Sequence, residues 1–163
     1  MNGLWAEVFV DLTDGERALR AIVRLTVAAA LGAVLGFERQ TEGKVTSARM
    51  HMIVALGAAL VTFLGAESDP ASASRVIQGV ITGIGFLGAG AIMKEEQNER
   101  VHGLTTAASV WLTAGVGMAV GSGYLWPAVY GVGLGWVVLS TLRITKTKLS
   151  GPDEEAKPGR HRK

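Results

Sequence analysis

Six ionisable residues stand at the edges of long apolar runs, where their side chains could bind an ion, pair with one another or contact a partner. They are Arg24, Glu38, Arg39, Arg49, His51 and Asp69. Ionisable groups are rare inside membrane segments because burying their charge in lipid is costly, so those that occur there point to function. We therefore treat these six residues as a candidate functional polar cluster.

Arg24 is the residue of this set that lies deepest in an apolar run. Arg17, Arg20 and Arg24 recur at helical spacing and therefore share one helix face. Arg24 lies about 10 Å along the axis from Arg17, so it needs a partner or a side chain that snorkels to the surface. Glu67 and Asp69, which follow the second apolar run, could supply that partner. The alternative is a structural arginine that fixes the orientation of the helix.

A second group of charges is expected at the opposite end of the same helix. Glu38 and Arg39 follow the first apolar run, and Arg49 and His51 open the second. Opposite charges this close favour ion pairs that hold two helices together. Contact with an ion or with a partner protein is the other interpretation.

The elements that must position these residues are helices long enough to cross a bilayer. Residues 76–93 and 101–142 contain no Asp, Glu, Lys or Arg, and a span needs about 20 apolar residues. The turn residues at 121–127 divide the longer run into two spans. We predict an all-α membrane protein, a bundle of five transmembrane helices over 16–37, 50–65, 75–93, 103–121 and 124–142.

Glycine is concentrated in the third span, whose sequence over 79–93 is GVITGIGFLGAGAIM. In lipid, small residues let two helices approach backbone to backbone, so we expect this span to pack tightly at the centre of the bundle. An unwound helix that exposes carbonyls to an ion is the alternative. The predicted helix-packing residues are Gly32, Gly36, Gly79, Gly83, Gly85, Gly88 and Gly90.

The distribution of basic residues predicts the orientation and the ends of the chain. Twelve of the 16 Lys and Arg residues fall on the side that carries the C-terminus, which places the C-terminus in the cytoplasm and the N-terminus outside. We expect residues 1–15 to form an interfacial segment and residues 16–143 the transmembrane domain. Residues 144–163 are predicted to be a basic, disordered cytoplasmic tail.

Enzyme and cofactor motifs are not found in this sequence. It has no Cys, no Walker motif and no HExxH zinc motif. A G-x-G-x-x-G pattern at 83–88 continues an apolar run with no acidic ribose partner after it, so we exclude a dinucleotide site. The sequence pI of about 9.2 reflects bases at span ends and in the tail, which argues against nucleic acid. We predict a protein that is not an enzyme, has no resident cofactor, and has no metal ligand that its sequence identifies.

Two stretches carry a resemblance to a known family. GFLGAG at 85–90, followed by GLTTAASVW at 103–111, resembles the MgtC/SapB family of bacterial inner-membrane proteins. The resemblance extends over roughly residues 20–125, including the first-span pattern that ends in Gly36, Glu38 and Arg39. It also includes Arg49 and His51 with VALGA at 54–58, and the third-span entry at Asp69, Pro70 and Arg75.

The chain departs from the family pattern in two places. The usual Gly-Leu-Arg-Thr-His is Ser-Ala-Arg-Met-His at 47–51, so the hydroxyl expected before His51 is replaced by Met50. Many relatives also carry a folded cytoplasmic domain after the last span, whereas about 20 tail residues follow here. We therefore expect a short member that lacks the C-terminal soluble domain.

The resemblance implies a role in magnesium homeostasis and adaptation to low magnesium, in a family associated with virulence in pathogens. The expected location is the bacterial inner membrane. The expected partners are the lipid bilayer and either a homo-oligomer or another membrane-protein complex, reached through helix contacts. The alternative is a transporter or channel for Mg²⁺ or another cation, and a purely structural bundle is a third interpretation. Mg²⁺ would then be a regulator or a substrate.

Overall fold

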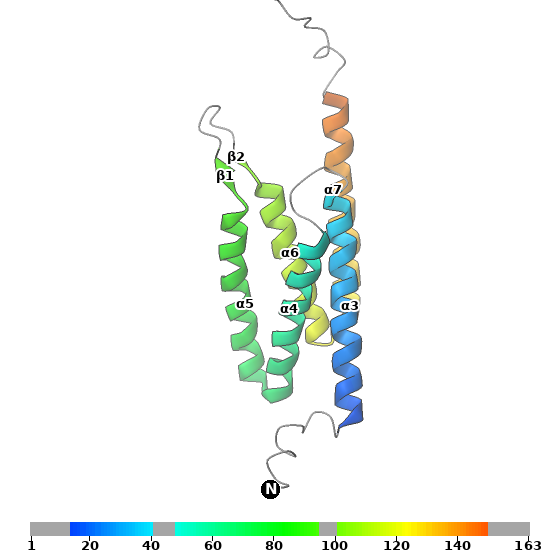
Figure 1. Ribbon diagram of the computed structural model, residues 1–163, viewed down its shortest axis with the longest axis vertical. Coiled ribbons are helices and arrows are strands. Elements are labelled where there is room, and N and C mark those ends of the chain that lie inside the picture. The colour runs from blue at the N-terminus through cyan, green and yellow to red at the C-terminus, as the bar shows by residue number, and fades with distance from the viewer. Residues whose placement is uncertain (1–13, 41–47, 95–100, 150–163) are drawn as a thin grey trace, which may run out of the picture.

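The computed structural model describes residues 14–40, 48–94 and 101–149, and within them the chain forms an antiparallel bundle of five helices (Figure 1). They are α3 (Gly15–Gln40), α4 (Ala48–Ser68), α5 (Pro70–Gly90), α6 (Leu104–Gly121) and α7 (Leu125–Leu149). Two-residue strands, β1 (Met93–Lys94) and β2 (Val101–His102), pair antiparallel between α5 and α6. The helices run alternately up and down the bundle. Its lower end in Figure 1 holds the start of α3 and the α6–α7 turn, and its upper end holds the start of α4 and α6.

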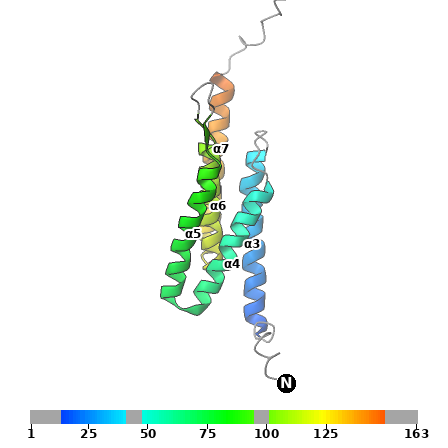
Figure 2. The same cartoon turned by 60° about the vertical axis from the view of Figure 1, so that its left-hand side comes forward.

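Helices α4 and α6 form the middle of the bundle. One buried cluster joins α3, α4, α6 and α7 around Leu35, Ala59 and Val120, and a second joins α4, α5 and α6 around Ala58 and Val110. Apolar faces of the other three helices therefore converge on this central pair. Turning the molecule leaves α4 between α3 and α5 (Figure 2).

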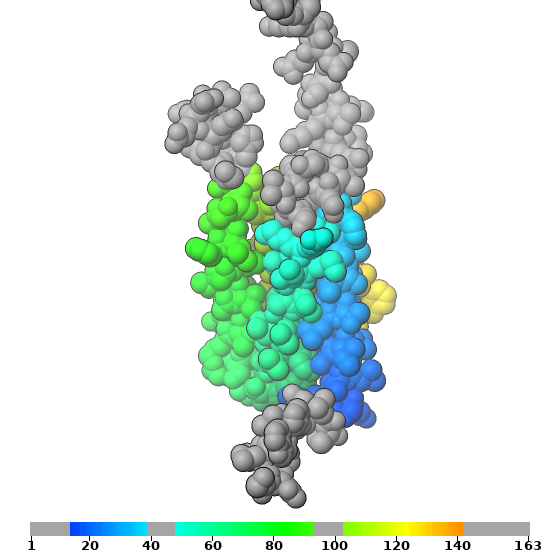
Figure 3. Space-filling view, viewed as in Figure 1, coloured from blue at the N-terminus to red at the C-terminus, as the bar shows by residue number. Residues whose placement is uncertain are grey.

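Helix α5 lies at the edge of the bundle, which corrects the prediction that this glycine-rich span is central. Ile84 is the one residue of α5 that the bundle buries. The space-filling view shows α5 as an outer column beside α4 (Figure 3). The physical reason is that its large side chains do not reach the core: Ile81, Phe86 and Leu87 are exposed. Side chains from α3, α4, α6 and α7 form that core instead.

The boundaries of α5 and α7 differ most from those that the sequence predicted. Helix α5 begins at Pro70 and not at residue 75, because Asp69 caps it and the fixed φ of proline suits the first helical position. Helix α7 continues to Leu149, so the predicted boundary of the tail at 144 falls inside a helix. Residues 1–13 and 150–163 lie outside the described residues. The expected interfacial segment and the rest of the tail therefore stay predictions.

Three of the helices in the described residues are long and apolar enough to cross a membrane. They correspond to Gly15–Glu38, Ala48–Ser68 and Leu104–Gly121, and Leu125–Thr141 is a shorter apolar helix. The prediction of an all-α membrane bundle is confirmed. That α5 also crosses the bilayer, and which end faces the cytoplasm, stay predictions.

Candidate functional site

The six candidate residues do not form one cluster, because they lie at the two ends of the bundle. Arg24 and Asp69 belong to the lower end, while Glu38, Arg49 and His51 belong to the upper end. Arg39 lies in α3 near Glu38, and its side chain is outside the described portion of the structure.

Arg24 binds the end of helix α6. Its Nη1 donates a hydrogen bond of 2.9 Å to the carbonyl oxygen of Gly121, one of the last carbonyls of α6. A cation at a helix C-terminus is favoured by the helix dipole. The guanidinium also lies over the Phe63 ring, 5.5 Å from its centroid, in cation–π geometry. Arg24 thus ties α3 to both α4 and α6.

The α6–α7 turn is shaped to accept this arginine. Gly123 has a φ of 90°, and a Cβ at this position would lie 2.8 Å from Arg24 Nη2. Glycine is the residue that adopts such a φ at no steric cost, and here it also leaves room for the guanidinium. Gly123 therefore lets the α6–α7 turn accommodate the Arg24 side chain.

The two acidic residues that the sequence offered as partners for Arg24 have other roles. Glu67 Oε2 lies 3.2 Å from Arg17 Nε, so this ion pair joins α3 and α4 at the lower end. Asp69 accepts hydrogen bonds of 2.9 Å from the backbone N–H groups of Ala71 and Ser72. Asp69 is the N-cap of α5 and not a ligand of Arg24.

Hydrogen bonding keeps Asp69 in its charged form. The Ser72 hydroxyl donates to its carboxylate and, with the N–H groups of Ser72 and Ala71, lowers the pKa of Asp69. Arg75 Nη2 in turn donates to Ser72 Oγ at 2.9 Å. The third-span entry is thus a local capping network whose chemistry is structural.

His51 is a buried link between α4 and α6 at the upper end. Its side chain is 0% exposed, and Nε2 lies 3.3 Å from Ser109 Oγ. The Ser109 hydroxyl donates to the Thr106 carbonyl at 2.8 Å. The Ser109 oxygen is then free to accept a hydrogen bond from His51 Nε2. The sequence marked His51, but nothing in the charge-free run around Ser109 identified its partner.

Glu38 links α3 to α7. The Ser140 hydroxyl lies 3.2 Å from Glu38 Oε1 and 2.8 Å from the Trp136 carbonyl, so its proton is shared between the two acceptors. Arg49 is exposed at the start of α4. Within the described residues no group of three or more His, Cys, Asp and Glu side chains could hold a metal ion. In the described residues, the Glu38 and His51 side chains at the upper end therefore make contacts between helices.

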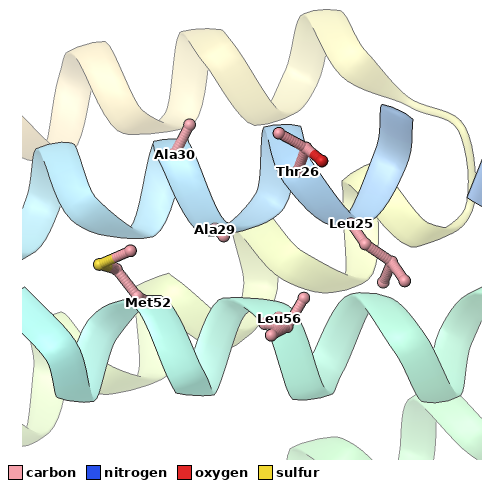
Figure 4. A pocket seen from close by; sticks show the side chains of 6 residues that line it. All are labelled: Leu25, Thr26, Ala29, Ala30, Met52 and Leu56. Carbon is pink, nitrogen blue, oxygen red and sulfur yellow. The ribbon is translucent and has the colours of Figure 1, made fainter. Parts of the chain in front are cut away.

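An apolar groove of about 450 Å³ lies between α3 and α4 (Figure 4). Leu25 lies toward one end of the labelled set and Met52 toward the other, with Leu56 between them (Figure 4). The lining residues are Leu25, Thr26, Ala29, Ala30, Met52 and Leu56. Because no ionisable side chain lines it, the groove is separate from the polar residues above.

The predicted packing glycines divide into two groups. A Cβ added to Gly32 would lie 2.7 Å from the His51 carbonyl oxygen, and one added to Gly36 would lie 2.6 Å from Ala48 Cα. These two glycines let α3 and α4 touch backbone to backbone. In α5, by contrast, no heavy atom of the described residues beyond the adjoining helix backbone lies within 4 Å of the Cβ positions of Gly79, Gly83, Gly85 and Gly90. For Gly88 the nearest is Ala107 Cβ, at an ordinary 3.8 Å.

Comparison with known proteins gives a consistent set of relatives. The chain is 39% identical over 119 residues to the Escherichia coli K12 protein named "Putative magnesium transporter YhiD", covering 68% of this chain and 54% of that protein. It is 43% identical over 116 residues to protein SrpB of Synechococcus elongatus, covering 63% of each. It is 42% identical over 102 residues to protein MgtC of Salmonella typhimurium LT2, covering 63% of this chain and 43% of that protein. No solved structure matches the chain.

The family assignment follows from a longer match. The chain spans between 43% and 63% of the length of these three relatives. The sequence profile of the MgtC family matches residues 25–148, which include most of α3 and all of α4 to α6. Together with the apolar helices, this match identifies a multi-pass membrane protein with bacterial relatives. The chain belongs to the MgtC family.

Proposed function

We propose that this protein serves magnesium homeostasis in the bacterial inner membrane and acts through helix contacts, with itself or with other membrane machinery. Family membership and the magnesium in the name of the YhiD relative support the link to magnesium. The observation that supports contact over conduction is the filled seam between α3, α4 and α6. The seam is defined by Gly32, Gly36, Gly117 and Gly121, the glycines at which these helices touch.

The seam leaves little room for a hydrated ion. A Cβ on Gly117 or Gly121 would collide with the backbone of Ala55 or Ala59, so α6 contacts α4 as closely as α3 does. Mg²⁺ dehydrates reluctantly and usually keeps several waters when bound. An ion that moved along this seam would have to separate α4 from both α3 and α6.

The polar side chains near the seam are already bonded within the protein. The Thr62 hydroxyl donates to the Ala58 carbonyl at 2.7 Å, and the Thr113 hydroxyl donates to the Ser109 carbonyl at 2.8 Å. Such bonds to the preceding helical turn satisfy a hydroxyl donor in an apolar setting. These groups support helix packing, which is what a protein that acts by helix contacts requires.

Complementation and transport, measured side by side, test this proposal. The gene would be expressed in a bacterium that lacks its own MgtC-family protein and grows poorly at low magnesium, and the purified protein would be sealed in liposomes with a Mg²⁺ dye. We expect restored growth and no flux above that of protein-free liposomes. Failure to restore growth, with the protein present in the membrane, would contradict the magnesium role.

Transport of Mg²⁺ or another cation is the second candidate, and the name of the YhiD relative is the observation that favours it. In a transporter, α4 and α6 would separate to admit the ion. Mg²⁺ flux above that of protein-free liposomes would replace the contact proposal with transport.

A further inference from the structure

Helix α5 combines the least burial in the bundle with polar groups on its exposed surface. Ile84 is its one buried residue, and the polar residues Gln78 and Thr82 are exposed. Inside a bilayer, each exposed polar group without a hydrogen-bond partner is costly. A membrane helix with these two properties requires another protein surface, and not acyl chains alone, to pack against its exposed face.

The polar groups of α5 lie on its outer face. Gln78 and Thr82 are exposed, share one side of the helix, and lie far around the axis from Ile84. The Thr82 hydroxyl donates to the Gln78 carbonyl at 2.9 Å, but the Gln78 side-chain amide has no hydrogen-bond partner in the described residues. It lies about 12 Å along the axis from Pro70, within the hydrocarbon if α5 crosses the membrane.

The backbone around Gln78 is open to close approach. Among the described residues, no atom beyond the adjoining backbone of α5 lies within 4 Å of the Cβ positions of Gly79, Gly83 and Gly85, whereas the glycines of the seam are in contact. A neighbouring helix could therefore come as near to α5 as α4 comes to α3. At that distance a side-chain amide reaches across the contact.

We propose that this outer face, defined by Gln78, Gly79, Thr82, Gly83 and Gly85, binds the same face of a second copy of the chain. This inference rests on the proposed function, which makes helix contact the mode of action. Copies inserted with the same topology and related by a two-fold axis along the membrane normal place their α5 helices parallel. Each Gln78 then meets the Gln78 of the second copy at equal depth.

The chemistry of Gln78 fits a self-complementary contact. A carboxamide is both donor and acceptor, so two identical groups satisfy each other. The contact contains no like charges, because the charged residue of α5, Arg75, lies near the helix start and donates to Ser72 Oγ at 2.9 Å. A different protein would have to present its own amide or hydroxyl at the same depth.

Disulfide crosslinking in native membranes tests the contact directly, because the chain has no cysteine of its own. Thr82→Cys is expected to give a crosslinked dimer on mild oxidation. Val138→Cys is the matched control, because it is exposed on α7 at a similar depth and runs in the same direction. Equal crosslinking at both positions would indicate random collision and overturn the proposal, as would a monomer at both.

Substitutions in this outer face should weaken dimerisation without unfolding the chain. In lipid nanodiscs, we expect Gln78→Leu to weaken dimerisation about fivefold, the size of one interhelical hydrogen bond in a membrane. Gly83→Leu should abolish the dimer, and the open space at its Cβ means that the monomer accommodates it. A dimer that neither change affects would refute this inference. So would crosslinking of Thr82→Cys to another protein in place of a second copy. Both results leave the proposed function unaffected. A dimer in a chain that fails to restore growth at low magnesium refutes the function alone.

Discussion

The Arg24 side chain connects three helices, α3, α4 and α6. Its guanidinium is part-buried, donates to the Gly121 carbonyl and stacks on Phe63. Arg20 lies one helical turn away, is exposed, and has no hydrogen bond or ion pair with the described residues. Two arginines on one helix face thus have different energetic roles, which the sequence spacing alone could not separate.

The first prediction concerns this pair of arginines. Arg24→Gln should lower the free energy of unfolding by about 1.5–3 kcal/mol, the range for a hydrogen bond to a charged group. Arg20→Gln should change it by less than about 0.5 kcal/mol, as for most surface positions. Unfolding in mixed detergent micelles, followed by circular dichroism, measures both. Equal losses in the two variants would show that charge, and not the contact with α6, is what matters.

The second prediction concerns the pH dependence of the α5 cap. Because hydrogen bonds lower the pKa of Asp69 from 3.8, its stabilising effect is complete above the unfolded pKa and is lost as the pH falls through the folded one. Below pH 3.8, hydrogen exchange should therefore speed up at the Ala71 and Ser72 amides, after correction for intrinsic rates. Asp69→Asn keeps an uncharged acceptor and should show no such transition. A transition of the same size in that variant would assign the effect to another group.

At the scale of elements, the seam and the outer face of α5 use glycine in opposite ways. Glycine in the seam removes a side chain where backbones meet, while glycine on α5 leaves a surface uncovered. Gly32 and Gly36 stand four residues apart, and so do Gly117 and Gly121. The second spacing was equally visible in the sequence and could have identified the α6 contact.

The third prediction compares two glycines of α6. Gly117→Ala places a methyl group against the Ala55 backbone and should destabilise the bundle by about 1–3 kcal/mol, the usual cost of overpacking. Gly115, two residues earlier, has open space at its Cβ, so Gly115→Ala should be neutral or stabilising by up to about 1 kcal/mol. The thermal midpoint in detergent distinguishes them. If both variants melt alike, the seam is not as tight as its geometry indicates.

The sequence predicted the helices better than their arrangement. Long apolar runs located all five helices, because a bilayer sets their length and disfavours charge. Position in the bundle depends on which apolar faces are bulky enough to fill a core, and glycine content misplaced α5 at the centre. Partners such as Gly121 for Arg24 and Ser109 for His51 are a backbone carbonyl and a neutral hydroxyl. Neither group is ionisable, so a search of the sequence for charged residues does not identify it.

On the scale of the whole molecule, the two ends differ in their chemistry. The lower end carries the Arg17–Glu67 ion pair, the Arg24 contact and the Asp69 cap. The upper end, together with the loops and the C-terminal stretch that continue from it in sequence, holds 12 of the 16 Lys and Arg residues. Lys and Arg are retained on the cytoplasmic side during insertion, while acidic residues contribute little to orientation. The upper end is therefore predicted to face the cytoplasm, although three arginines of α3 oppose this bias.

The fourth prediction tests this orientation with single cysteines in the cysteine-free chain. Ser68→Cys lies exposed at the lower end and Leu104→Cys exposed at the upper end. In intact spheroplasts, a membrane-impermeant maleimide should label Ser68→Cys at once and Leu104→Cys only after the membrane is permeabilised. The reverse pattern would mean that the α3 arginines outweigh the twelve bases, because the first helix often dominates insertion. Labelling of both positions in intact cells would indicate copies in two orientations. In oppositely oriented copies the α5 helices would not be parallel, so the two Gln78 residues would not be held at the same depth.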